Sequence, residues 1–379
     1  MSPIKLLPPI AITVGVVAAA GAVAVPAMAA TVVNAKVVSS TKVEFKATAG
    51  KTDNLTVTLS GRTVTFDNKV TVKAGKGCKA VKNDVTKVTC TTSAATEWVT
   101  VSLGDKNDAV RNQTGLGMSV WGGTGTDTIT GGPKNDYLHG GANYDRIWGS
   151  GGNDRIWGDA GGDSLDGGVG DDSIDGAAGN DVILGRDGDD EILDGAGNDR
   201  VYGGGGSDFL FQSNLTTGTD KDLLSGGAGD EDAASYYIRE TAVTADADGA
   251  TGDDGKKGEG DSIGSDVEGL QGGNAGDRLV GSARSDILVG SPGNDTLIAG
   301  ASDDVVVGEE GSDSLDGGTN TEVGDYCDED FADSIVDCEF YLSGAPTTES
   351  ARAGLSASRQ AAVSTLSRKA EALSAGLGR

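Results

Sequence analysis

A nine-residue repeat constrains this chain more than any other feature of its sequence. Ten nonapeptides run without a gap from Gly122 to Phe211, and the first two read GGTGTDTIT and GGPKNDYLH. Aspartate occupies the sixth position of all ten, an aliphatic residue occupies the eighth position of all ten, and glycine occupies the first position of nine, the exception being Asp194. A fixed period of this kind indicates a stack of small similar units and not a globule with one central core.

A second array of the same repeat covers residues 272–325, where Glu322 replaces the aspartate of the last unit. Weaker units flank the first array, with Asp108 before it and Asp222 after it. We expect the sixth-position aspartates to share one role as metal ligands: Asp127, Asp136, Asp145, Asp154, Asp163, Asp172, Asp181, Asp190, Asp199, Asp208, Asp222, Asp277, Asp286, Asp295, Asp304 and Asp313.

Each repeat predicts one short strand and one glycine-rich turn. The residues on either side of the eighth position point away from it, so a three-residue strand buries one aliphatic side chain. Glycines allow the positive φ angles that a tight turn requires. Two repeats then form one turn of a flattened coil, and we expect an all-β fold in which identical positions stack.

The apolar residues of this coil are too few to fold it. Ordering nine residues costs ~9–18 kcal/mol of backbone entropy at ~1–2 kcal/mol per residue, whereas one buried Ile or Leu returns only ~1.5–3 kcal/mol. Residues 122–211 also carry 18 acidic and 5 basic residues, in a chain of net charge −28. We expect the array to stay unfolded without a counter-ion, and the negative charge argues against a nucleic-acid partner.

Calcium is the cation that fits this pattern. It takes 6–8 oxygen ligands, including carboxylates and backbone carbonyls, while magnesium demands stricter geometry. An ion that bridges consecutive turns on one side of the coil gives at most eight sites in the first array, because the ten repeats form two columns and each column loses one site.

The pattern GGxGxDxUx resembles the RTX, or haemolysin-type, calcium-binding nonapeptide repeat, which residues 122–129 match at every fixed position. The resemblance covers about 200 of the 379 residues and extends to the secreted RTX-repeat proteins of actinobacteria. It implies a parallel β-roll in which the sixth-position carboxylates and the carbonyls of positions one, three and five bind calcium. Carried over to this chain, the carbonyl ligands are those of Gly122, Thr124, Thr126, Gly140, Gly158, Gly167, Val169, Asp171, Gly176, Ala178, Asn180, Gly290 and Asn294.

The first residues predict a secretory signal peptide. Lys5 precedes an apolar run from Ile10 to Val25, and after Pro26 the residues Ala27-Met28-Ala29 form an A-x-A cleavage site. We expect a secreted, extracellular protein with no membrane segment after cleavage; a retained anchor is the alternative.

Four cysteines predict two local disulfides, Cys78–Cys90 and Cys327–Cys338, as an oxidising compartment allows. A zinc site is the alternative, but neither pair has C-x-x-C spacing and His139 is the only histidine.

The remaining segments complete the predicted organisation. Residues 30–104 alternate as strands do and carry 11 basic and 5 acidic residues, so they either cap the coil or dock on an anionic cell-wall or surface polymer. Residues 235–271 interrupt the repeats, either as an excursion from one coil or as a linker between two. The predicted parts are a signal peptide (1–29), a small β-sandwich-like domain (30–104), the first array (105–234), the insertion (235–271), the second array (272–325), a disulfide-closed cap (326–341) and a flexible or weakly helical tail (342–379).

Catalysis has little support in the sequence. Residues 260–264 (GDSIG) fit the G-x-S-x-G pattern of hydrolases by letter, but no strand precedes them and no helix follows. We therefore expect a non-enzymatic, secreted calcium-binding protein with a structural or extracellular-matrix role. A calcium-stabilised adhesin or cell-surface binding module is the alternative.

Overall fold

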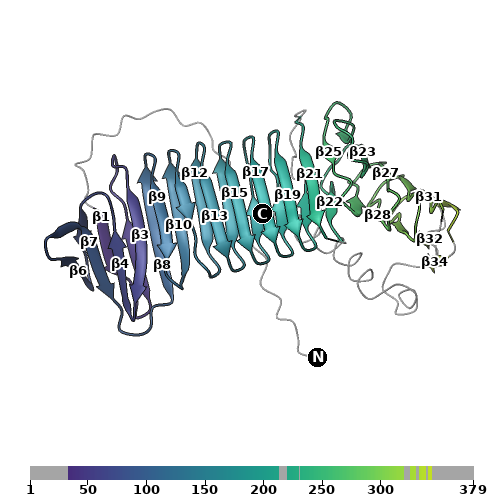
Figure 1. The fold of residues 1–379 in the computed structure, drawn as a ribbon. Coiled ribbons are helices and arrows are strands. Elements are labelled where there is room, and N and C mark those ends of the chain that lie inside the picture. The colour runs from purple at the N-terminus through teal and green to yellow at the C-terminus, as the bar shows by residue number, and fades with distance from the viewer. Residues whose placement is uncertain are drawn as a thin grey trace.

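The computed structural model describes residues 33–212, 220–229, 231–319, 325–329, 333–338 and 340–343. Over these residues the chain consists of strands and turns with no helix, and none of them forms an apolar helix that could cross a membrane. The strands stack along one long axis, from the purple N-terminal end to the yellow C-terminal end (Figure 1). The predicted signal peptide and residues 344–379 of the predicted tail lie outside the described part.

Three sheets build the molecule, with 16, 12 and 6 strands. Sheet A contains, in spatial order, β34 (Phe340–Ser343), β32 (Tyr326–Glu329), β30 (Val305–Val307), β28 (Ile287–Val289), β26 (Gly269–Gln271), β22 (Ala233–Ser235), β20 (Phe209–Phe211), β18 (Glu191–Leu193), β16 (Ser173–Asp175), β14 (Arg155–Ala160), β12 (Tyr137–Ala142), β10 (Gly117–Thr124), β8 (Trp98–Asp105), β2 (Lys42–Lys46), β1 (Val33–Val37) and β5 (Val72–Ala74). Sheet B contains β25 (Ser262–Ile263), β21 (Leu223–Ala228), β19 (Arg200–Gly205), β17 (Val182–Asp187), β15 (Ser164–Val169), β13 (Arg146–Gly151), β11 (Thr128–Thr130), β9 (Ala109–Gln113), β3 (Asn54–Ser60), β4 (Thr63–Asp67), β7 (Asp84–Thr91) and β6 (Cys78–Val81). Sheet C contains β24 (Gly255–Lys256), β23 (Val243–Asp246), β27 (Arg278–Val280), β29 (Thr296–Ile298), β31 (Ser314–Asp316) and β33 (Ser334–Val336).

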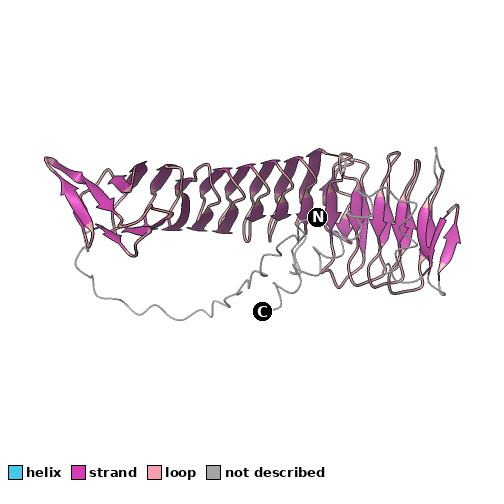
Figure 2. Ribbon diagram, turned by 90° about the horizontal axis from the view of Figure 1, so that it is seen from below, coloured by secondary structure: helices cyan, strands magenta, loops and turns pink. Residues whose placement is uncertain are grey.

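Strands two repeats apart pair in parallel. Leu138 of β12 lies between Val120 of β10 and Ile156 of β14, so equivalent residues follow at 18-residue intervals. Successive repeats join sheets A and B alternately, and their strands form regular rows along the axis (Figure 2). The predicted all-β parallel roll, with two repeats to each turn, is confirmed.

The eighth-position side chains form the core between the sheets. Ile129, Leu138 and Ile147 are fully buried, as are the equivalent residues along the rest of the first array. They belong to one hydrophobic cluster that runs from the N-terminal strands to Cys338. The core is one aliphatic side chain wide in each sheet, which leaves the turns to be stabilised by something other than apolar packing.

The N-terminal strands form two layers, but these layers continue directly into the coil. β2 pairs in parallel with β8 and β3 pairs in parallel with β9, so both sheets cross residue 104. Asp53-Asn54-Leu55 repeats the aspartate–x–aliphatic triplet of the array, and the Asp53 amide donates to Asp108 Oδ1 at 2.7 Å, so β3 stacks on the first weak unit as one more coil. The two layers of residues 33–104 are therefore continuous with the coil.

Residues 235–271 change one face of the coil and leave the other intact. Sheet A continues without a break through β22, β26 and β28, whereas sheet B ends at β25 and sheet C begins beside it. Ile238 of this segment packs with Leu193, Phe211 and Val289 in a second apolar cluster that joins the two arrays. The predicted excursion therefore keeps the coil continuous along sheet A only.

Both predicted disulfides are present. Cys78–Cys90 joins the antiparallel strands β6 and β7 at the N-terminal end, and Cys327–Cys338 links β32 to the residues that follow β33.

Candidate calcium sites

The sixth-position aspartates are buried where the turns of successive coils meet. All sixteen predicted aspartates are at most 3% exposed. Aspartate is almost never buried to this degree without a compensating partner. The burial of so many carboxylates in a strongly acidic chain raises the question of what neutralises them.

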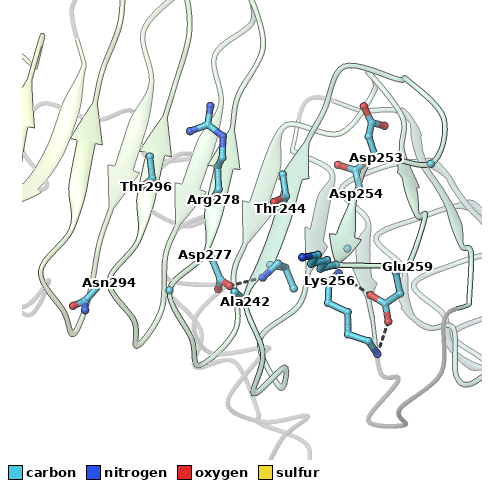
Figure 3. A pocket seen from close by; sticks show the side chains of 16 residues that line it. Ala242, Thr244, Asp253, Asp254, Lys256, Glu259, Asp277, Arg278, Asn294 and Thr296 are labelled. Atoms are coloured by element: carbon cyan, nitrogen blue, oxygen red, sulfur yellow. Dashed lines mark hydrogen bonds and ion pairs between the residues drawn. The ribbon is translucent and has the colours of Figure 1, made fainter.

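One oxygen of most of these carboxylates belongs to a backbone ladder. The Asp127 amide donates to Asp145 Oδ1, and the Asp145 amide donates to Asp163 Oδ1, both at 2.7 Å. The same bond recurs along two columns of the first array and along a third column that starts where the Val243 amide donates to Asp277 Oδ1 at 2.8 Å (Figure 3). The structure therefore arranges the predicted aspartates as columns of neighbours 18 residues apart, and not as one cluster.

The second oxygen of these carboxylates is the feature that points to a metal. Asp163 Oδ2 is buried and has no hydrogen-bond partner. A Cβ atom placed on Gly158, the first residue of the same repeat, would lie 2.7 Å from this oxygen and 2.8 Å from the carbonyl oxygen of Gly176 in the next coil. Glycine thus lets the backbone approach a carboxylate oxygen and a carbonyl oxygen more closely than any side chain would allow. Oδ2 atoms without a hydrogen-bond partner are also found on Asp127, Asp145, Asp154, Asp172, Asp181, Asp190, Asp199 and Asp222.

This donor set fits calcium, which prefers carboxylate and carbonyl oxygens in a flexible arrangement. Among the predicted carbonyl ligands, those of five first-position glycines lie beside the first-position glycine of the preceding coil and its sixth-position carboxylate: Gly140, Gly158, Gly167, Gly176 and Gly290. The third-position carbonyls differ, because Val169 and Ala178 each accept a backbone hydrogen bond, from Gly152 at 2.9 Å and Gly161 at 2.8 Å. A carbonyl has two lone pairs, so each keeps one for an ion.

Burial makes these carboxylates hard to ionise without a cation. Desolvation raises the pKa of Asp154 and of Asp190 to about 8, and the adjacent aspartates of the column add to the rise. The hydrogen bond that each carboxylate accepts from a backbone amide lowers the pKa and so opposes this rise. The pKa of Asp145 rises to about 7 for the same reasons. A divalent cation beside these oxygens supplies the opposite charge that restores the carboxylate form.

Basic side chains neutralise buried acidic residues at the insertion, where the nine-residue spacing is lost. Arg239 Nη1 lies 2.9 Å from Glu259 Oε1, and both side chains are buried, at 4% and 0% exposure. Lys256 adds a second ion pair to Glu259 at 2.8 Å, and Arg284 pairs with Glu268. The protein therefore uses its own cations where the repeat spacing is lost.

A pocket of about 630 Å³ opens beside these ion pairs, at the start of sheet C (Figure 3). Asp253, Asp254, Lys256, Glu259 and Arg278 are among the residues that line it. Its charged groups are largely engaged with one another or with the backbone: Glu259 binds Lys256, and Asp254 accepts from the amides of Asp246 and Ile263.

The structure adds acidic residues that the nine-residue spacing missed: Asp53, Asp232, Asp261, Glu268, Asp325 and Asp333. All except Asp53 accept the amide of a preceding residue of their column, and Asp53 donates its own amide to Asp108. Each of these acidic residues is followed by one variable residue and then an apolar one. This three-residue pattern alone, without the nine-residue spacing, could therefore have identified them. Glu322 lies outside the described residues, and Asp325 Oδ1 accepts the Asp304 amide in its place, at 2.8 Å.

The G-x-S-x-G match has a structural explanation in the same terms. Asp261 Oδ1 accepts the Asp222 amide at 3.1 Å and so continues a column. Ser262 belongs to β25, the last strand of sheet B, and its hydroxyl accepts a hydrogen bond from the Gly252 amide at 2.9 Å.

His139 stacks between Trp121 and Trp157 on sheet A, with ring centroids 5.9 and 4.3 Å away.

Comparison with protein-family models finds the RTX calcium-binding nonapeptide repeat at residues 121–156, 148–183, 175–210, 271–305 and 289–320. These segments coincide with the aspartate columns of the two arrays. No curated protein matches the chain.

Proposed function

Because this chain is an RTX-repeat protein, with calcium-binding nonapeptide repeats within residues 121–210 and 271–320, we propose that it is a secreted structural protein whose coil is assembled by the calcium ions it binds. The observation that carries this proposal is the row of buried Oδ2 atoms without hydrogen-bond partners beside first-position glycines. The signal peptide predicted over residues 1–29 and the two disulfides support an extracellular site of action.

Calcium is proposed to lie between successive turns of a column. The sixth-position carboxylates would hold it together with the carbonyls of the intervening turns, in up to about eight sites of the first array. At the affinities of extracellular calcium modules, ~10⁻⁴–10⁻³ M, each ion contributes ~4–5.5 kcal/mol on the standard-state scale. Several such ions offset the conformational entropy that the narrow core leaves uncompensated. The product is a rod whose rigidity depends on external calcium.

Calorimetric titration and circular dichroism of the mature chain test this proposal. We expect disorder of the arrays in EDTA, recovery of β signal with millimolar calcium, and little recovery with magnesium. Asp172→Asn should lower the cooperativity of folding because it removes a buried ligand. Asp187→Asn removes the same charge from an exposed side chain and should leave the titration unchanged. A coil that is fully formed in EDTA would refute the proposal.

An adhesin or cell-surface binding role is the second candidate, and the charge of the N-terminal strands favours it. Nine lysines of this segment are exposed: Lys36, Lys42, Lys46, Lys51, Lys69, Lys73, Lys76, Lys79 and Lys82. They offer a basic surface to an anionic cell-wall polymer, opposite in sign to the arrays. Retention of the intact chain on cell walls, weakened by salt and by Lys46→Glu with Lys73→Glu, would support this role, and no retention of the unaltered chain would reject it.

A further inference from the structure

Asp194 breaks the glycine rule of the repeat at one place in the coil. The first-position residues that stack in successive coils, 18 residues apart, are Gly122, Gly140, Gly158 and Gly176, and then Asp194. At each of these glycines a Cβ atom would press against the sixth-position carboxylate of its own repeat. A side chain at this position is therefore brought close to the sixth-position carboxylate of its own repeat.

The substitution creates a group of three buried carboxylates. Asp194, Asp199 and Asp222 each bring one carboxylate oxygen within 4.8 Å of the other two. They are 1%, 1% and 3% exposed. Asp199 belongs to the same repeat as Asp194, and Asp222 belongs to the next coil, where its Oδ1 accepts the Asp199 amide at 2.8 Å. Asp194 Oδ1 accepts the Gly195 amide at 2.6 Å, which fixes the orientation of this side chain.

Two further observations indicate that this group is built around a ligand. The Oδ2 atoms of Asp199 and Asp222 are buried without hydrogen-bond partners, and neither residue forms an ion pair within the described part of the chain. Gln212, which follows Asp194 by 18 residues in the same stack, is fully buried. Both its side-chain amide oxygen and its amide nitrogen lack a hydrogen-bond partner. Polar side chains in such a setting need a partner of opposite charge or a donor-rich ligand.

We propose that Asp194, Asp199 and Asp222 form a separate, high-affinity cation site at the C-terminal end of the first array. The inference rests on the proposed calcium function and adds Asp194, a ligand that the repeat pattern does not contain, to two sixth-position aspartates. An ordinary site of this coil has one carboxylate from each of two successive turns, whereas this site has three carboxylates, two from one turn and one from the next. The affinity of a calcium site rises with the number of charged ligands, so this site should fill first and should favour a trivalent lanthanide most strongly.

Calorimetric titration of the full chain with calcium, and separately with terbium, tests the proposal. We expect one calcium site at least tenfold tighter than the rest. Asp194→Asn, which keeps the shape of the side chain, and Asp194→Gly, which restores the repeat, should both abolish this site. Asp187→Asn is the matched control, because it removes one negative charge from an exposed position of the preceding repeat, and it should keep the tight site.

Circular dichroism at saturating calcium establishes that each variant folds, and Asp194→Asn decides the result if the glycine variant does not. A tight site that persists in both variants overturns the proposal, as does an unaltered chain that folds on calcium with a single class of sites. That outcome leaves the general calcium function intact. An unaltered chain that neither binds calcium nor folds with it overturns both.

Discussion

Gly158→Ala tests the reason for the first-position glycine, because it adds one methyl group beside the carboxylate that we assign to calcium. The added Cβ would lie 2.7 Å from Asp163 Oδ2, 2.8 Å from the Gly176 carbonyl oxygen and 3.4 Å from Asp163 Cβ. Two of these distances are far below an ordinary van der Waals contact, and one partner is backbone. The Asp163 carboxylate must move, or the two coils must separate.

Overpacking of this kind costs about 1–3 kcal/mol of folding free energy. In a chain of this size each kcal/mol lowers Tm by about 2–4 °C, so Gly158→Ala should lower the Tm of the calcium-loaded protein by about 2–12 °C. The calcium concentration at the folding midpoint should also rise, because the methyl group occupies the space beside Asp163 Oδ2. Thermal unfolding followed by circular dichroism at several calcium concentrations measures both effects.

Gly151→Ala is the matched control in the preceding repeat. Its added Cβ would meet nothing closer than the Val169 carbonyl oxygen at 3.8 Å and Pro133 Cα at 3.9 Å, and Gly151 has no positive φ angle. We expect a change in stability within about 0.5 kcal/mol. If the two variants lower Tm and calcium affinity equally, the explanation of the first-position glycine is wrong.

Other predictions follow from the buried charges. In EDTA the folded coil binds more protons than the unfolded chain, because its carboxyl pKa values lie near 7–8 for residues such as Asp154 and Asp145 while the unfolded values lie near 4. These protons therefore stabilise the calcium-free coil at low pH, and that stabilisation is lost as the pH rises through about 7. The β signal in EDTA should increase when the pH is lowered from about 7.5 to about 5.5. An unchanged β signal would contradict these pKa shifts. Arg239→Met should destabilise the insertion by about 3 kcal/mol, because it leaves the buried Glu259 with Lys256 alone; chemical denaturation in saturating calcium would show this, and an unchanged midpoint would mean that Lys256 compensates fully.

The nine-residue spacing made the coil and its aspartate columns predictable. Each repeat encodes the same strand, turn and buried residue, so the environment of Ile129 also describes that of its stacked neighbours Ile147 and Leu165 in the next two coils. The disulfides were predictable because the partners in each pair lie close in sequence and far from the other pair.

Features that depend on pairing between distant segments were not predictable. The alternating residues of β2 and β3 fit a separate sandwich equally well, and only their parallel partners β8 and β9 join them to the coil. The break between sheets B and C depends on where the insertion returns, which no local pattern encodes. In the repeat pattern Asp194 was only the exception to the first-position glycine, because its proximity to Asp222 requires both the coil and the irregular spacing that follows Phe211.

Amide hydrogen exchange at the sixth-position aspartates measures the central claim most directly. The amides of Asp127, Asp145 and Asp163 each donate to the carboxylate of the next coil, so their exchange reports whether adjacent turns are stacked. At about pH 7.5 we expect strong protection in millimolar calcium and exchange close to that of an unfolded chain in EDTA. Equal protection of these amides in both conditions would contradict the claim that bound calcium holds the coil together.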